Sequence, residues 1–235
     1  MKTVGIIGGI APESTIEYYR SIIATYQEQA QDGSYPSIII NSIDLKKMLD
    51  LIATNELSDL TDYLAAEVEK LARGGADFAV LASNTSHIVF DEISRRSSIP
   101  LLSIIEATCE AAKAMGLKRI GLFGTHFIMR GRFYAELFSG EGMTIVAPRR
   151  EEQDYIHDKY MNELVKGHFL PETRAGLLSI ADRMKERDGI EGLILGGTEL
   201  PLILKDITDR GIPFLDTTQI HVKRIVTQLL TQVSP

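Results

Sequence analysis

The 235-residue sequence contains one pattern of short segments twice, at a nearly constant spacing. Each copy has an apolar run with a central glycine, a second apolar run that ends in small polar residues, and an Ile-Pro pair followed by apolar residues. The equivalent positions are Gly5 and Gly121, Ser83 and Gly197, and Pro100 and Pro213. These pairs are 116, 114 and 113 residues apart. Three matches in one order indicate a duplicated unit rather than an array of many repeats.

The stretch 77–87 shows how each copy is expected to fold. Its apolar run is too short for an ordinary helix, follows Gly74-Gly75 and ends in small polar residues. This pattern is typical of a strand buried on both faces of a parallel sheet. Segments with helical periodicity alternate with such strands. We therefore predict an α/β fold of two pseudo-symmetric, duplicated domains, each a mainly parallel sheet flanked by helices.

The duplication also predicts the domain boundaries. One further helix, at about 219–230, follows the second copy, and we expect it to pack back on the first. The predicted domains are residues 1–104 with about 217–235, and residues about 105–216. Near the N-terminus, a helix starting at Pro12 is predicted to have an apolar face, formed by Ile16, Tyr19, Ile22, Ile23 and Tyr26.

Polar residues at the ends of two predicted strands form the candidate ligand site. In open α/β sheets, ligands bind at the carboxyl ends of strands. The residues in these positions are Ser83, Asn84, Thr85 and His87 in the first copy and Gly197, Thr198 and Glu199 in the second. If the two copies face each other, position 83 faces position 197 across a ligand in the cleft between the domains. Such a site suits a reaction that needs one group on each face of a planar carbon.

Composition and charge exclude several classes of function. The net charge of −7 argues against nucleic-acid binding, and no run of about 18 apolar residues indicates a membrane span. The N-terminus lacks the layout of a signal peptide, and the single cysteine, Cys109, excludes an internal disulfide. The histidines lack the spacing of metal ligands, so we predict no metal site. The expected location is the cytoplasm, and Cys109 is expected to be a buried packing residue.

The chain resembles the cofactor-independent aspartate/glutamate racemases over nearly its whole length. The matching segments are Gly5-Ile6-Ile7-Gly8-Gly9 with Pro12 and Thr15, Asn84-Thr85-Ser86-His87, Gly124-Thr125, Gly197-Thr198-Glu199 and Pro213-Phe214-Leu215-Asp216. In that family the residues before Asn-Thr and before Thr-Glu are usually both cysteines. One removes the α-proton and the other protonates the opposite face. The resemblance implies an isomerase that acts on a small amino acid or dicarboxylate, without a cofactor and usually as a homodimer.

The resemblance also implies roles for individual residues. Asn84, Thr85, Thr125 and Thr198 would hold the amino and α-carboxylate groups of the substrate, and Glu199 is also expected to bind the substrate. Lys166 matches a family lysine that meets the side-chain carboxylate, and Lys46 or Lys47 lies near a family arginine with the same task. The turn that contains Gly9, with Thr15 after it, lacks the spacing of a dinucleotide loop and is expected to hold a carboxylate through its backbone amides.

The sequence departs from the racemase pattern at the two catalytic positions, which are Ser83 and Gly197. A serine hydroxyl is a far weaker acid than a thiol and needs a neighbouring base, for which His87 is a candidate, although His87 could equally cap or pack. Glycine has no side chain that could transfer a proton. The two-cysteine mechanism is therefore not possible, and we expect impaired racemase chemistry on an acidic amino acid. The alternatives are a catalytically inactive binder of amino acids or dicarboxylates, and a one-base isomerase or lyase of the same superfamily.

Overall fold

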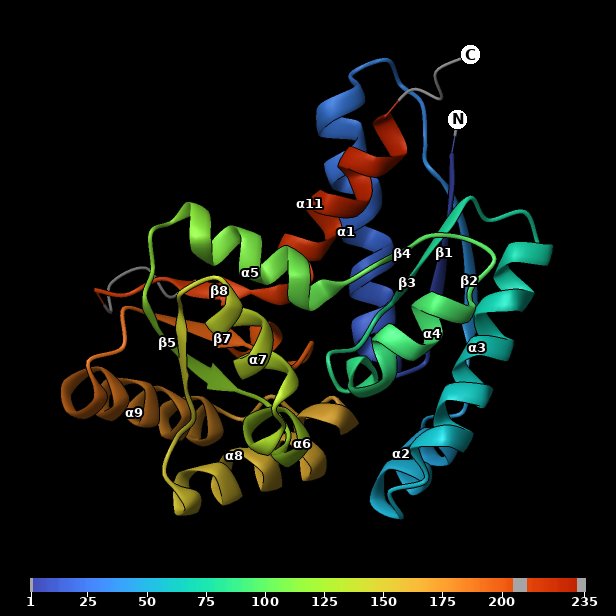
Figure 1. The fold of residues 1–235 in the computed structure, drawn as a ribbon. Coiled ribbons are helices and arrows are strands. Elements are labelled where there is room, and N and C mark those ends of the chain that lie inside the picture. The colour runs from blue at the N-terminus through green and yellow to red at the C-terminus, as the bar shows by residue number, and fades with distance from the viewer. Residues whose placement is uncertain (1, 205–210, 232–235) are drawn as a thin grey trace. The chain divides into compact units, whose positions relative to one another are not determined.

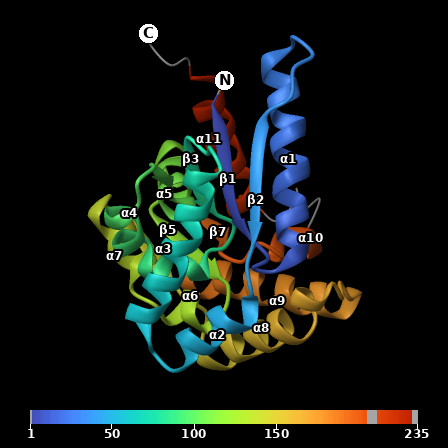
Figure 2. The same cartoon turned by 90° about the vertical axis from the view of Figure 1, so that its right-hand side faces the viewer.

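The computed structural model describes residues 2–204 and 211–231 of the chain. The chain divides into two compact units, which are Met1–Ile104 with His221–Pro235 and Ile105–Ile220. Figures 1 and 2 trace the chain through both units. None of the described helices is long and apolar enough to cross a membrane.

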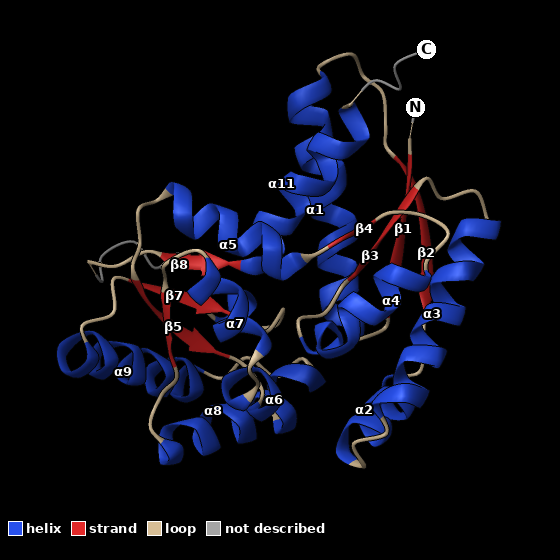
Figure 3. Ribbon diagram, in the orientation of Figure 1, coloured by secondary structure: helices blue, strands red, loops and turns tan. Residues whose placement is uncertain are grey.

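The first unit contains a four-stranded parallel sheet with the strand order β2-β1-β3-β4 (Figure 3). Its strands are β1 Thr3–Gly8, β2 Ser37–Ser42, β3 Phe78–Leu81 and β4 Leu101–Leu102. Its helices are α1 Pro12–Ala30, α2 Leu45–Ala53, α3 Leu57–Arg73, the 3₁₀ helix η1 Thr85–Val89, α4 Phe90–Arg96 and α11 Thr217–Leu230, whose first residues belong to the second unit. Parallel neighbours throughout require the helical crossovers that the alternating sequence pattern predicted.

The core of this unit shows why the last helix returns to the first sheet. Val4 and Ile6 of β1 pack with α1 and with Val222 and Ile225 of α11. Gly5, between them, faces the other side, where an added Cβ would lie 3.0 Å from Leu71 of α3. Alternate residues of β1 therefore contact helices on opposite faces of the sheet, as the continuous apolar run predicted.

The predicted apolar face of α1 is partly wrong. Ile22 and Tyr26 are buried as expected, but Ile16 and Tyr19 are 44% and 46% exposed. Tyr18 lies in the core in their place. The buried face is shifted by about one position from the predicted face. The shift arises because the buried face includes small polar side chains, such as Ser14 and Thr15, which a pattern of apolar residues does not contain.

The second unit repeats the arrangement, with a parallel sheet of strand order β6-β5-β7-β8. Its strands are β5 Arg119–Phe123, β6 Thr144–Val146, β7 Gly192–Leu195 and β8 Phe214–Asp216. Its helices are α5 Ile104–Ala114, α6 His126–Arg130, α7 Phe133–Gly140, α8 Arg150–Asn162, η2 Leu164–Lys166, α9 Pro171–Asp188 and α10 Leu200–Ile203. The equivalent strand orders confirm the predicted α/β class with two parallel sheets.

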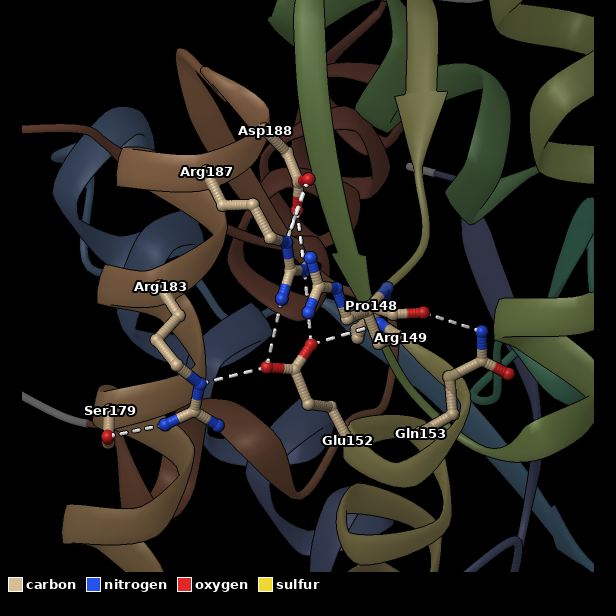
Figure 4. Close-up of polar contacts among 8 residues, drawn as sticks. All are labelled: Pro148, Arg149, Glu152, Gln153, Ser179, Arg183, Arg187 and Asp188. Carbon is tan, nitrogen blue, oxygen red and sulfur yellow. Dashed lines mark hydrogen bonds and ion pairs between the residues drawn. The ribbon is translucent and has the colours of Figure 1, made fainter.

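Helices α8 and α9 of this unit are joined by a buried carboxylate (Figure 4). Glu152 accepts hydrogen bonds from Arg183 Nε at 2.9 Å, from Arg187 Nη2 at 3.2 Å and from the backbone N–H of Arg149 at 2.9 Å. Arg187 also pairs with Asp188 at 2.6 Å. Burial raises the pKa of Glu152, but the arginine hydrogen bonds outweigh it and the net shift is downward. The network fixes α8, which carries a residue of the candidate site described below.

Candidate functional site

In both sheets the order in which strands are added reverses at the first strand. The candidate residues lie beside this reversal. In each sheet the second strand pairs on one side of the first strand, and the third strand pairs on the other side. Such a reversal is where open α/β sheets bind ligands, beyond the carboxyl ends of the two central strands. In the first unit these ends lead to Gly9 and Ser83, and in the second they lead to Thr125 and Gly197.

The hydrogen-bond ladders show that positions 83 and 197 are structurally equivalent. The last ladder bond between β1 and β3 runs from Ala82 N–H to the Ile7 carbonyl, at 2.9 Å. The corresponding bond between β5 and β7 runs from Gly196 N–H to the Phe123 carbonyl, at 2.8 Å. In each sheet the next residue is the first one free of the ladder. The 114-residue offset in the sequence therefore reflects the same place in the fold.

In the first unit, Ser83 opens a tight 3₁₀ turn. Its backbone carbonyl accepts hydrogen bonds from Ser86 Oγ at 3.0 Å and from His87 Nδ1 at 2.9 Å. Ser83, Asn84 and Thr85 are all buried, with exposures of 6%, 2% and 8%. Within residues 2–204 and 211–231, the Ser83 hydroxyl makes no hydrogen bond of its own, so it can serve a ligand.

The geometry of His87 opposes a role in activating Ser83. Its Nδ1 atom bonds to the Ser83 carbonyl, and its Nε2 atom accepts the backbone N–H of Ile104 at 3.2 Å. The ring also stacks on Phe90, with centroids 4.7 Å apart. Burial, and then the charge of His221, lower the pKa of His87 to about 3, so the ring is neutral at physiological pH. Both ring nitrogens are thus occupied by backbone groups, and His87 holds the loop rather than facing the Ser83 hydroxyl.

Gly9 and Thr15 contact each other, and this explains both residues. Gly9 has φ of +80°, and an added Cβ would lie 2.6 Å from the Ile43 carbonyl oxygen. Only glycine fits such a turn. The Gly9 N–H donates to Thr15 Oγ1 at 2.8 Å. The Gly9 amide is therefore already bonded within the protein, and binding of a ligand carboxylate by the other amides of this turn stays a prediction.

The three candidate lysines, Lys46, Lys47 and Lys166, are exposed and differ in their contacts. Lys47, on α2, lies over the ring of Tyr63 with its Nζ atom 4.1 Å from the centroid, whereas Lys46 pairs with Asp50 at 2.6 Å. The side-chain ammonium group of Lys166, at the end of η2, makes no hydrogen bond or ion pair with any residue in the described part of the chain. Its ammonium group can therefore meet an anionic ligand without giving up a protein partner.

In the second unit, Thr125 and Thr198 have defined partners. Thr125 caps α6, because its Oγ1 atom accepts the Ile128 N–H at 3.4 Å. Thr198 donates its hydroxyl to Glu199 Oε2 at 3.0 Å. Glu199 is only 1% exposed.

Tyr160 also belongs to the candidate site, although no sequence motif indicates it. It lies on α8, and its phenol donates a hydrogen bond to Glu199 Oε2. A Cβ atom added to Gly197 would lie 2.4 Å from Tyr160 Cε2 and 2.9 Å from its Oη atom. The ring therefore fills the space that a side chain at position 197 would need. Glycine at position 197 is the one sequence signal for this residue, because the space left by a missing side chain in a core is usually filled by a large neighbour.

The described residues contain no group of three or more His, Cys, Asp or Glu side chains that could hold a metal ion. His126 and His157 do stack, with ring centroids 3.9 Å apart, and the His126 N–H donates to His157 Nδ1 at 3.2 Å. Cys109 is buried, as expected, and burial raises the pKa of its thiol.

Comparison with known proteins identifies the family. Residues 7–225 match the family model described as Asp/Glu/hydantoin racemase. A solved structure of an aspartate racemase homologue from Pyrococcus horikoshii is 33% identical, covers 97% of this chain and 99% of that chain, and has a TM-score of 0.83. A proposed Asp/Glu racemase from Yersinia pestis is 30% identical, covers 98% of this chain and 100% of that chain, and has a TM-score of 0.87. The broad-specificity amino-acid racemase RacX of Bacillus subtilis is 23% identical and covers 98% of this chain and 100% of its own length.

Proposed function

Because the chain belongs to the Asp/Glu/hydantoin racemase family, we propose that it binds a small acidic amino acid or dicarboxylate at the carboxyl ends of β3 and β7. The chemistry is cofactor-independent proton transfer at the α-carbon, and it is slow because position 83 is serine and position 197 is glycine. The single observation that carries this proposal is the equivalence of positions 83 and 197 at the direction change of each sheet.

The proposed ligand contacts divide by chemical group. Asn84, Thr85, Thr125 and Thr198 bind the amino and α-carboxylate groups, and Lys166 binds the distal carboxylate. What supports the role of Lys166 is its exposed ammonium group, which lacks a partner among the described residues. A carboxylate removed from water needs a cationic or multiply hydrogen-bonding partner. The expected homodimer and cytoplasmic location remain predictions.

Calorimetry with a Lys166→Ala variant tests the substrate class. The substitution is expected to weaken binding of succinate or aspartate by about tenfold to a hundredfold, the range for one charge-assisted hydrogen bond. Alanine, which lacks a distal carboxylate, should bind the variant and the wild type alike. Lys223→Ala removes an exposed lysine from α11 and serves as the matched control.

An equal loss of succinate and alanine binding would reject the role of Lys166. A wild-type chain that binds none of these compounds would reject the proposed substrate class. The second candidate, a binder without catalytic activity, is favoured by the absent side chain at position 197. It predicts normal succinate binding and no exchange of the α-hydrogen.

A further inference from the structure

The side-chain space of position 197 is occupied by the phenol of Tyr160. The ring reaches it from α8, where Tyr160 is 7% exposed, and its Oη atom lies 2.9 Å from the point at which a Cβ would stand. Glycine at 197 therefore does not leave an empty hole. It allows a different acidic hydrogen, that of a phenol, to lie beside the point at which a side chain of residue 197 would begin.

The phenol is connected to a second proton-accepting group. Tyr160 Oη–H donates to Oε2 of Glu199, and Thr198 Oγ1–H donates to the same oxygen at 3.0 Å. Two donors on one carboxylate oxygen stabilise its negative charge. Burial, and then the charge of Glu199, raise the pKa of Tyr160 well above 10. The phenol is therefore protonated at neutral pH, and it can accept a proton only by passing its own to the carboxylate.

We propose that Tyr160 and Glu199 form a proton-transfer pair that acts on one face of the substrate α-carbon, in place of a position-197 thiol. The proposal rests on the proposed function, because it needs an amino acid bound at this strand end. Two geometric observations support the pair: the phenol fills the side-chain space of 197, and it donates a hydrogen bond to a buried carboxylate.

The step balances without a cofactor or any redox partner. The Cα–H bond breaks and its hydrogen forms a new Oη–H bond on Tyr160. At the same time the original phenol hydrogen moves to Oε2 of Glu199. The electron pair of the Cα–H bond stays on the substrate as a carbanion delocalised into its carboxylate. Exchange of the Glu199 proton with water and reversal of the same transfers then return a solvent-derived hydrogen to the same face.

One proton-transfer pair predicts exchange without racemisation. The other equivalent position carries Ser83, and both nitrogens of its neighbour His87 are held by backbone groups. We therefore expect no comparable base for the opposite face of the α-carbon. The α-hydrogen of one enantiomer should exchange, and the other enantiomer should be untouched.

The test follows exchange of the α-hydrogen by NMR in deuterated water, with D- and L-aspartate and D- and L-glutamate as separate substrates. Tyr160→Phe keeps the ring and removes only the hydroxyl, so a residue that merely packs would not change the rate. We expect the wild type to exchange one enantiomer, and Tyr160→Phe to lose at least about a hundredfold of that rate, the contribution of a positioned acid–base group. Glu199→Gln should lose a similar factor. Tyr155→Phe, on the same helix, is the control and should exchange normally.

Calorimetry with succinate on the same variants separates the possible failures. Equal exchange by wild type and Tyr160→Phe overturns the pair and leaves the proposed function standing. Succinate binding without exchange of any of the four substrates also overturns the pair, and favours the binder. Loss of succinate binding in Tyr160→Phe would contradict the proposal, because a proton-transfer group should change the rate far more than the affinity. A wild type that binds no ligand overturns the proposed function and the pair together.

Discussion

The Tyr160 ring occupies the space that a side chain at position 197 would need. A residue larger than glycine therefore fits at 197 only if the tyrosine moves. A Cβ would lie 2.4 Å from the ring of Tyr160, a residue in the core cluster of its unit. We predict that Gly197→Cys lowers the free energy of unfolding by about 1–3 kcal/mol, the usual cost of overpacking. The double variant Gly197→Cys/Tyr160→Ala should relieve this clash, so its loss should be smaller than the sum of the two single losses.

Urea denaturation of the four proteins in this cycle measures the coupling. Ser83→Cys is the matched control, because position 83 already carries a side chain and should accept a thiol with little change. Additive losses at 197 and 160 would show that the two side chains do not compete for space.

Two buried neutral histidines make the first unit sensitive to acid. Burial lowers the pKa of His221 to about 4, and burial with the charge of His221 lowers that of His87 to about 3. His221 Nδ1 accepts the Tyr18 hydroxyl at 2.8 Å, and its Nε2 atom bonds to the Leu102 carbonyl at 3.0 Å. Because the ordinary pKa of about 6.5 holds in the unfolded chain, the unfolded state binds protons first as the pH falls.

The resulting prediction has a defined sign and pH range. The stabilisation from these histidines is complete above about pH 6.5 and is lost as the pH falls toward 4 for His221 and toward 3 for His87. Each histidine should cost about 1.4 kcal/mol of unfolding free energy per pH unit below 6.5. Denaturation of wild type and His221→Gln between pH 7.5 and 5 measures this. The variant should be less stable at pH 7.5 and show a shallower slope, and equal slopes would refute the account.

The sequence could identify the strand-end residues of the candidate site, because they belong to contiguous segments repeated at one offset. Ser83 and Gly197 illustrate this, since the backbone pattern alone makes them equivalent. Tyr160 could not be found this way, because it meets Gly197 only through the packing of α8 on the second sheet. The hydrogen bond from the Gly9 amide to Thr15 could not be predicted from the sequence either, because it depends on the conformation of the turn between the two residues.

At the scale of elements, the regular strands and the returning last helix followed from apolar runs, whereas several helices of the second unit were not foreseen. Helix α8 is the important case. Its polar residues give little periodic signal, and its position depends on the Glu152 network with α9 (Figure 4). When a helix is held mainly by ion pairs and a few buried residues, its sequence shows only weak periodicity of apolar residues.

The Glu152 network is expected to stabilise α8 measurably. Glu152→Ala leaves Arg187 and Arg183 without their shared carboxylate. We predict a loss on the order of 2 kcal/mol, below the range for fully buried pairs because Arg183 is about half exposed. Glu151→Ala, one position earlier and exposed, is the control and should be nearly neutral. Urea denaturation at pH 7 compares the two, and equal losses would show that the network adds no stability.

At the scale of the whole molecule, the duplicated sequence predicts that each unit supplies one half of a reaction centre. The two sheets have the same strand order, and each places one racemase-pattern position just beyond its third strand. The prediction from the sequence is that one substrate contacts both strand ends. A reaction that needs a functional group at position 83 and another at position 197 tests whether one substrate contacts both strand ends.

Racemisation by a variant with both thiols restored tests the central claim most directly. The variant is Ser83→Cys/Gly197→Cys/Tyr160→Ala, in which the last change makes room for the second thiol. Chiral chromatography of aspartate and glutamate should show interconversion of both enantiomers, whereas the same variant with Ser83 intact should exchange the α-hydrogen of one enantiomer only. A triple variant that folds and binds succinate but interconverts neither amino acid would contradict the assignment of positions 83 and 197. Racemisation by the unmodified chain at ordinary enzymatic rates would contradict it as well.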